Sequence, residues 1–339
     1  MRKLLVCLSL IALNGVPAHA RITSPPDLRE VPGARFEYAA AQRLIRLSDG
    51  SDFVIDSRPW PKEPSATDAI FVSARGRAYD MVFAVNLWIP AQVADGTRGQ
   101  IYSAAMSDDH DWIAVVGGWM GKEDHRGHNG IFILHRQMPA PGAEFWKLKL
   151  WFDVRGMTIG EVEFGPGDTL LTTSHDHDDS PIITAFTFAG QKIGSFVDAG
   201  KHSGSACREM RIQKLDSSSL AVYDPEASSV RFLTVSSKGD TIDVQQARTV
   251  PAVFPERRSY PLAFVVLPDG RIAIARTIAD EQRRGQTLVS VLSPNGDVIE
   301  QWSSPRVWRY AYADGRTLNG IYPTAPDDER PVIRSVAIQ

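Results

Sequence analysis

The sequence predicts an all-β protein built from repeated four-stranded antiparallel sheets, and three observations support this. No segment combines a helical period with capping residues at both ends. Short runs rich in Val, Ile, Phe and Tyr recur along the whole chain of 339 residues. Asp-Gly, Asn-Gly or Pro separate these runs, and those residues favour tight turns between strands.

The clearest unit spans residues 262–302 and divides into two hairpins joined by a polar loop over 278–286. Each hairpin has a turn that contains glycine, Gly270 in the first and Gly296 in the second. Glycine suits these positions because it adopts the positive φ that tight hairpin turns require. The predicted strands are 262–267, 271–277, 287–292 and 297–302.

The same order of strands and turns recurs at 167–196 and 218–245, and further second strands are expected within 49–57, 110–137 and 313–322. One apolar residue from each second strand marks a period of about 50 residues. Six units at this period are typical of a β-propeller, in which each sheet forms one blade. The marker residues are Phe53, Trp112, Leu170, Leu220, Ile272 and Leu318.

The last unit provides only three strands before the chain ends, the third of them at 332–339. Residues 34–40 precede the strands of the first unit and can pair with 332–339 as the missing outer strand. That pairing would close the ring and remove its open edges. The sequence therefore predicts one domain over 21–339, a six-bladed β-propeller closed by an N-terminal strand that joins the last blade.

Three strings carry a resemblance to known families: LPDGRIAIAR, TLVSVLSPNGDVIEQW and SLAVYDPEASSVRFLTVSSKGD. They resemble the repeats of six-bladed propellers of the NHL, TolB-like and gluconolactonase types. The resemblance implies the fold and assigns no catalytic residue to this chain. Such propellers include hydrolases, lyases, sugar-lactone enzymes and binding modules, so the function has to be inferred from the site.

The first 20 residues are typical of a secretory signal peptide. Arg2 and Lys3 precede an apolar run over 4–13, and an Ala-x-Ala cleavage signal follows at 18–20. We expect the mature chain to begin at Arg21 and to be secreted or periplasmic. The apolar run is too short to span a bilayer, and no later stretch approaches the required length of about 20 residues, so no membrane span is expected.

Composition argues against several classes of partner and enzyme. Removing residues 1–20 reduces the basic side chains from 37 to 35 against 40 acidic ones, a net charge of −5, which disfavours nucleic acid binding. Cys207 then has no second cysteine for an internal disulfide, and we expect it to be buried. The chain also lacks the Gly-x-Ser-x-Gly, HExxH, phosphate-loop and CxxCH motifs of readily identified enzymes and haem proteins.

Histidines cluster on one predicted face of the propeller, where the loops between second and third strands and the connections between blades emerge. His110 is expected on the opposite face and His135 on a strand. The spacings His-x-x-His and His-x-His allow two imidazoles to bind one divalent cation, which would activate water for hydrolysis. The candidate metal ligands are His125, His128, His175 and His177, with His202 on the same face.

Acidic residues in these loops offer oxygen ligands, and Asp176 or Asp179 is a candidate general base. Asp178 adds a further oxygen for calcium, although the spacing of an EF-hand loop is missing. Asp108 to Asp111 are expected to form a tight turn with local side-chain to backbone bonds. The alternative interpretation is that the His-rich segments are ordinary solvated loops and that no cofactor is bound.

Arginines and aromatic residues on the same face are candidates for ligand binding, because arginine binds anions bidentately and aromatic rings stack on apolar or sugar surfaces. These candidates are Arg257, Arg258, Trp60, Trp119, Tyr322 and His202. Five further tryptophans are expected to pack in the core between blades: Trp112, Trp146, Trp151, Trp302 and Trp308.

The sequence thus favours an exported propeller that binds a small molecule, peptide or protein partner on its loop-rich face. A metal-dependent hydrolase or lactonase-like enzyme that uses the His-rich loops is the alternative. A structural scaffold subunit is a third possibility. Nothing in the sequence names the substrate or partner, and the question of enzyme activity stays open.

Overall fold

The computed structural model describes most of the chain from residue 29 onward. The described residues are 29–35, 41–46, 52–56, 69–75, 81–88, 100–120, 127–140, 143–154, 156–176, 181–197, 206–254, 259–279, 285–304, 308, 310–314, 317–323 and 331–337.

Four antiparallel sheets each contain four consecutive strands in chain order. The first of these sheets has β6 (Gln100–Met106), β7 (Trp112–Met120), β8 (Gly127–Ala140) and β9 (Ala143–Asp153). The next has β10 (Met157–Phe164), β11 (Thr169–Asp176), β12 (Pro181–Thr187) and β13 (Lys192–Val197). The third has β14 (Arg211–Asp216), β15 (Ser219–Asp224), β16 (Ser229–Lys238) and β17 (Thr241–Pro251). The fourth has β18 (Ser259–Val266), β19 (Ile272–Ala279), β20 (Gly285–Leu292) and β21 (Val298–Ser304).

The remaining strands come from the two ends of the chain. At the N-terminal side, β2 (Ala41–Arg46) pairs with β3 (Asp52–Asp56), and β4 (Ala69–Arg75) pairs with β5 (Met81–Trp88). At the C-terminal side, β22 (Tyr310–Asp314), β23 (Thr317–Pro323) and β24 (Pro331–Ala337) form a sheet whose fourth strand is β1 (Arg29–Arg35).

The four-stranded repeat expected from the sequence is confirmed in the four sheets from β6 to β21. All six marker residues lie on the second strand of their sheets, namely β3, β7, β11, β15, β19 and β23. The four strands predicted within 262–302 correspond to β18 to β21, and the turn glycines Gly270 and Gly296 have φ values of 84° and 97°. Hydrophobic alternation and turn glycines were therefore sufficient to locate the hairpins.

The position of the N-terminal strand differs from the expectation. β1 covers Arg29–Arg35 and pairs with β24, with Arg29 opposite Ser335, whereas the predicted strand was 34–40. β2 begins at Ala41 in a different sheet. A strand extending to residue 40 would leave no chain to cross from the outer edge of one sheet to the next, a distance of about 14 Å at the usual strand spacing.

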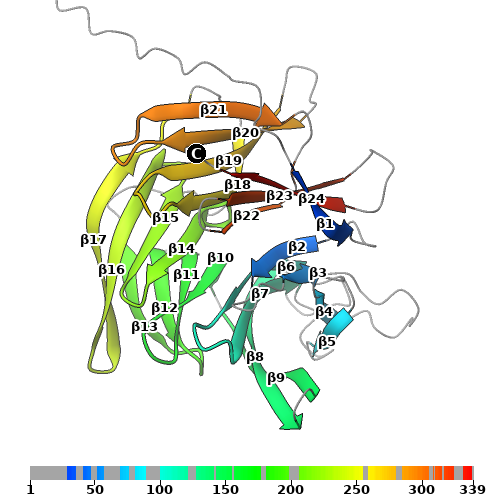
Figure 1. Ribbon diagram of the computed structural model, residues 1–339. Helices are drawn as coiled ribbons and strands as arrows, with labels where there is room; N and C mark the ends of the chain where they lie inside the picture. Colours follow the sequence, from blue (N-terminus) through cyan, green and yellow to red (C-terminus); the bar gives the residue numbers. More distant parts are fainter. Residues whose placement is uncertain are drawn as a thin grey trace, which may run out of the picture.

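The sheets are arranged around a common centre, and one strand from each of six sheets faces inward: β2, β6, β10, β14, β18 and β22 (Figure 1). Each of these inner strands contacts the inner strands of neighbouring sheets, in the order β2, β6, β10, β14, β18, β22. Antiparallel four-stranded sheets in such a radial arrangement define a propeller-type fold. The interfaces between sheets hold the core. One core cluster joins the β10–β13 and β14–β17 sheets through residues that include Leu171, Ile183, Leu220, Leu233 and Ile242.

Polar side chains connect consecutive inner strands by accepting backbone hydrogen bonds. Ser103 Oγ on β6 accepts from Val162 N on β10 at 3.1 Å. Glu161 Oε2 on β10 accepts from Ile212 N on β14 at 3.0 Å. The Gln213 side-chain oxygen on β14 accepts from Val266 N on β18 at 2.6 Å. These bonds satisfy inner-strand amides that lie against a neighbouring sheet, and one of them, Val162, borders the bulge on β10.

A four-residue helix, α1 (Ala206–Glu209), is the only helix in the part of the chain that the structure describes. It holds Cys207, whose side chain is 1% exposed and whose thiol donates to Thr158 O at 3.5 Å. The burial expected for this cysteine is confirmed. Burial raises the pKa of the thiol from 9.0 to about 12.

We therefore predict that Cys207 resists thiol reagents in the folded protein. Between pH 7 and pH 10, iodoacetamide should label Cys207 only in denatured protein, because the thiolate is the reactive form. Above about pH 9 the unfolded chain loses this proton while the folded chain keeps it, so Cys207 should lower stability as the pH rises toward 12. Mass spectrometry of labelled native protein checks the first point, and rapid labelling at pH 8 would contradict it.

The β6–β7 turn carries backbone strain at His110. Its φ is 60°, while the corresponding β10–β11 and β18–β19 turns have glycines at Gly167 and Gly270 with positive φ. A side chain in this left-handed region costs about 1 kcal/mol. We predict that His110→Gly raises the free energy of unfolding by about 0.5–1 kcal/mol, measured by urea denaturation. His110→Ala is the control, since it removes the imidazole but keeps the Cβ. The strain explanation would be refuted if His110→Ala stabilised the protein and His110→Gly did not.

Candidate functional site

Two of the predicted His-rich segments emerge at the same end of neighbouring sheets. β7 ends at Met120 and β8 begins at Gly127, while β11 ends at Asp176 and β12 begins at Pro181. These strand ends of the β6–β9 and β10–β13 sheets therefore lie on the face opposite to the tight turns. Asp176, the first candidate base, is the last residue of β11 and is half-buried.

Several predicted site residues lie outside the described residues. They are His125, His177, Asp178, Asp179, Trp60, Arg257, Arg258 and His202. Tyr322 lies on β23, but its side chain is also outside the described part. The described candidates on this face are Trp119, His128, His175 and Asp176.

His128 forms the centre of a compact group at the start of β8. Its Nδ1 lies 3.5 Å from Asp153 Oδ2 at the end of β9. Its ring stacks on Trp119, which is directly opposite in the β7–β8 ladder, with centroids 5.8 Å apart and planes inclined by 12°. Trp119 is 5% exposed and also contacts Trp151 edge to face. The carboxylate and the indole together restrain the orientation of the imidazole.

Asn129 connects this group to the next sheet. Its side-chain nitrogen donates to Met157 O at 3.1 Å, at the first residue of β10. The neighbouring residue Thr158 is opposite His175 in the β10–β11 ladder. The structure thus brings His128 and His175 to one end of two adjacent sheets. Alternation along β8 and β11 places Asn129 on the sheet face opposite to His128, and His175 on the face of β11 that Leu171 and Thr173 share, toward the β14–β17 sheet. We call the strand ends that carry Trp119, His128, Asn129, Asp153 and His175 the loop-end corner.

Two polar atoms of the loop-end corner are buried without a hydrogen-bond partner among the described residues. They are Trp119 Nε1 and the side-chain oxygen of Asn129, which is 4% exposed. Leaving such an atom unpaired costs about 1–3 kcal/mol, so native proteins seldom tolerate it without a reason. Trp119 Nε1 lies on the same sheet face as the His128–Asp153 pair, whereas Asn129 lies on the opposite face. The indole nitrogen beside this pair makes the corner the strongest candidate site among the described residues of the loop-rich face.

The arrangement supports proton transfer or ligand binding by His128. A carboxylate beside one imidazole nitrogen orients the ring and favours the tautomer that carries its proton on that nitrogen. Within the described ranges, no three histidine, cysteine, aspartate or glutamate side chains form a group suited to a metal ion. Two of the four proposed ligands, His125 and His177, are not among the described residues.

Sequence reasoning selected Trp119, His128 and His175 but missed Asp153 and Asn129. Asp153 is the last residue of β9 and has no motif around it, and Asn129 lies within a strand whose sequence is typical of ordinary β structure. Both join the site because of cross-strand register: Asp153 is opposite Gly130, and Asn129 is opposite Gly118. Only the alternation of facing residues on β8 and β9 could have indicated them.

The opposite face holds a cavity with a volume of about 260 Å³. The turns β6–β7, β10–β11 and β14–β15 surround it, and Trp112, Phe164 and Phe188 contribute aromatic side chains. Trp112 was expected in the core between blades, but it is half-buried and lines this cavity because it follows the β6–β7 turn directly. No site was predicted on this face.

The turn over Asp108 to Asp111 has the predicted local bonds. His110 N donates to Ser107 O at 3.0 Å, and Asp111 N donates to Asp109 Oδ1 at 3.0 Å. His110 therefore lies at the turn end of the molecule. His135 is on β8 as expected, opposite Trp112, and their rings are 4.1 Å apart.

Comparisons with known proteins identify the fold. No family model and no curated protein matches the chain. A periplasmic gluconolactonase from Pseudomonas aeruginosa is similar over 87% of this chain and 88% of its own, with 11% identity and a TM-score of 0.52. A protein from Lactobacillus plantarum is similar over 88% of this chain and 85% of its own, with 13% identity and a TM-score of 0.50. These similarities support the propeller-type fold that the repeats indicated.

The part of the chain that the structure describes contains no helix of the length and hydrophobicity needed to cross a bilayer.

Proposed function

We propose that the chain is an exported six-bladed β-propeller that binds a small molecule at the loop-end corner. Six blades are supported by the closed sequence of contacts between inner strands, from β2 through β22 and back to β2. The pairing of β1 with β24 supports closure of the ring by the N-terminal strand. Peptide or protein partners remain the alternative occupants of the same face.

The observation that carries the binding proposal is the restrained imidazole of His128. Trp119 supports one face of the ring and Asp153 lies beside Nδ1, while the His128 side chain remains 25% exposed. An exposed polar group on a rigid, mostly buried support is the usual composition of a small-molecule site. A hydroxyl-rich ligand fits this chemistry, because imidazole, amide and carboxylate groups both donate and accept hydrogen bonds.

Calorimetric titration with D-glucose and D-gluconate tests this proposal. We expect at least one of them to bind the wild-type protein, and His128→Ala to weaken that binding by about tenfold or more. His135→Ala is the matched control, because the same residue type lies further along the same strand, opposite Trp112 at the start of β7. The proposal is wrong if neither compound binds, or if the two variants weaken binding equally.

A metal-dependent or lactonase-like hydrolase is the second candidate function. Fold similarity to a protein named as a gluconolactonase favours it. His128 and His175 lie at one end of adjacent sheets, on strand faces directed away from each other, so a shared cation would need His125 and His177 as well. The proposed ligands of a divalent cation are His125, His128, His175 and His177, with Asp176 or Asp179 as general base. The metal would lower the pKa of its bound water and so supply the nucleophile.

Hydrolysis of D-glucono-δ-lactone, followed by proton release with and without chelator, tests the enzyme proposal. Elemental analysis of the mature protein should then find one cation per chain, and chelation should lower the melting temperature. Replacing His125 and His175 together with alanine should abolish both the metal and the activity. Absence of a stoichiometric metal together with an unchanged melting temperature after chelation would rule out the metal-dependent form.

Export is the remaining part of the proposal. N-terminal sequencing of the protein recovered from outside the cytoplasm should begin at Arg21. Recovery of a chain that retains residues 1–20 in the cytoplasm would contradict it.

A further inference from the structure

The cavity at the turn end has an aromatic wall assembled from two sheets. Trp112 follows the β6–β7 turn, whereas Phe164 and Phe188 belong to the β10–β13 sheet and its turns. The Trp112 and Phe188 rings meet edge to face with centroids 5.3 Å apart, and Phe164 and Phe188 do so at 6.0 Å. Edge-to-face contacts of this kind hold the rings in fixed positions.

The polar side of the cavity is dominated by carboxylates. Asp108, Asp109 and Asp168 line it together with a single basic residue, Lys214. Lys214 Nζ lies 2.7 Å from Asp108 Oδ2, so this pair is neutralised. Two negative charges remain, from Asp109 and Asp168. A site with this balance attracts cations and repels anions such as sugar acids or phosphates.

Local hydrogen bonds hold Asp109 in its ionised form. The Ser107 hydroxyl donates to Asp109 Oδ1 at 2.5 Å, and the backbone N–H of Asp111 donates to the same oxygen at 3.0 Å. These bonds lower the pKa of Asp109 below its usual value. The other carboxylate oxygen, Oδ2, accepts neither of these bonds, and it is the atom that would meet a ligand.

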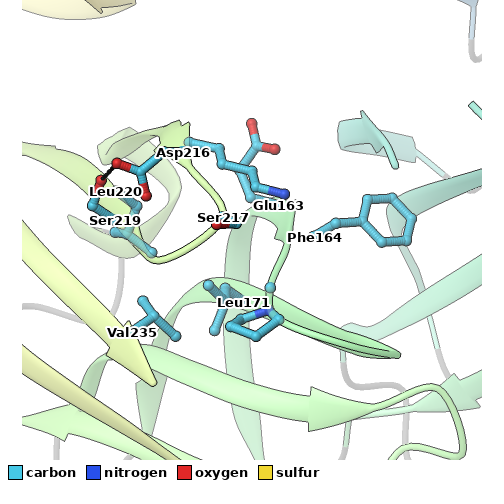
Figure 2. A pocket seen from close by; sticks show the side chains of 11 residues that line it. Glu163, Phe164, Leu171, Asp216, Ser217, Ser219, Leu220 and Val235 are labelled. Atoms are coloured by element: carbon cyan, nitrogen blue, oxygen red, sulfur yellow. Dashed lines mark hydrogen bonds between the residues drawn. The ribbon is translucent and has the colours of Figure 1, made fainter. Parts of the chain in front are cut away.

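A smaller cavity beside the first one extends the acidic region. Its volume is about 10 Å³, enough for one water molecule, and it shares Phe164 and Lys214 with the larger cavity. Figure 2 shows Phe164 and Asp216 on opposite sides of it, with Leu171 and Val235 below. The Ser219 hydroxyl donates to Asp216 at 2.5 Å, and together with neighbouring donors this bond lowers the pKa of Asp216. The rim around Lys214 is therefore negative as well.

We propose that the larger turn-end cavity is a second binding site, specific for a small organic ammonium ion. The ammonium group would bind between Asp109 and Asp168, and the attached hydrocarbon chain would lie along Trp112 and Phe188. An ammonium ion near an aromatic ring is attracted by the negative face of the ring in addition to its attraction to carboxylates. This site is independent of the loop-end corner, which lies at the other end of the same sheets.

Three ligands of matched length test the proposal by calorimetric titration of the mature protein. Cadaverine carries two ammonium groups, 1,5-pentanediol is its neutral counterpart, and glutarate is its anionic counterpart. We expect cadaverine to bind, the diol to bind at least about fivefold more weakly, and glutarate not to bind. Raising the salt concentration should weaken cadaverine binding, because the carboxylates are partly exposed.

Variants then locate the site. Asp168→Asn should weaken cadaverine binding about fivefold, whereas Asp240→Asn, which changes an exposed carboxylate in the β16–β17 turn outside the cavity, should not. Thermal melting confirms that both variants are folded, and Trp112→Phe should alter the fluorescence change on binding. Absence of cadaverine binding, equal binding of the diol, or equal effects of the two variants would overturn the proposal. His128→Ala should leave this binding unchanged, which separates it from the proposed function.

Discussion

Replacing Asp224 with alanine is expected to lower the free energy of unfolding by about 3–5 kcal/mol. Asp224 is fully buried at the end of β15, and Arg231 on β16 is 5% exposed. Arg231 Nη1 lies 2.5 Å from Asp224 Oδ2, and the other carboxylate oxygen accepts from Ala227 N at 3.0 Å. The variant would leave a buried guanidinium without this carboxylate and would release the β15–β16 turn. Urea denaturation followed by circular dichroism measures the loss.

The double variant Asp224→Ala with Arg231→Met separates the ion pair from simple packing. The double variant should lower the free energy of unfolding less than Asp224→Ala alone, because it does not leave the guanidinium buried without the Asp224 carboxylate. Asp269→Ala is the control for an exposed pair. Asp269 bonds Arg271 at 2.8 Å in the β18–β19 turn, and its loss should cost less than about 1 kcal/mol. Equal losses for Asp224 and Asp269 would refute the role given to burial.

The strands could be predicted from the sequence because their signals are local. Gly270 and Gly296 adopt positive φ in tight turns, and the residues on either side alternate between apolar and polar. A second strand in each unit could therefore be marked by one apolar residue, such as Leu170 or Leu220. The N-terminal strand was placed five residues too late, since its position depends on the length of a connection and no local pattern marks it.

The contacts between sheets could not be predicted, because they join residues that are about 50 positions apart. Glu161 accepts from the amide of Ile212 in the next sheet, and nothing around either residue marks this bond. The same limit applies to the candidate site. Trp119 and His128 stood out by residue type, but their pairing with Asp153 follows from the register of β7, β8 and β9. The turn-end cavity went unnoticed because short turns from three sheets were needed to enclose it.

Replacing Trp302 with alanine is expected to lower the free energy of unfolding by about 3–5 kcal/mol, through loss of packing alone. Trp302 on β21 is 1% exposed, and its ring meets the fully buried Trp308 edge to face at 5.6 Å. Val265, Val289 and other apolar side chains complete this cluster, which confirms the expected core position of both tryptophans. Trp308 cannot easily move into the vacated space. The backbone N–H of Trp308 donates to Thr287 Oγ1 at 2.7 Å, and its indole N–H donates to Ser304 Oγ at 3.2 Å.

Ile299→Ala is the matched control for this prediction, because Ile299 lies on the same strand with 54% of its surface exposed. Its loss should change stability by less than about 0.5 kcal/mol. The stability loss for Trp302→Phe should lie between the losses for Trp302→Ala and Ile299→Ala, since phenylalanine removes only part of the ring volume. If Trp302→Ala proves no more harmful than Ile299→Ala, the β18–β21 sheet does not depend on the tryptophan cluster. In that case the other apolar side chains of this cluster, such as Val265 and Val289, must stabilise the sheet without the tryptophan pair.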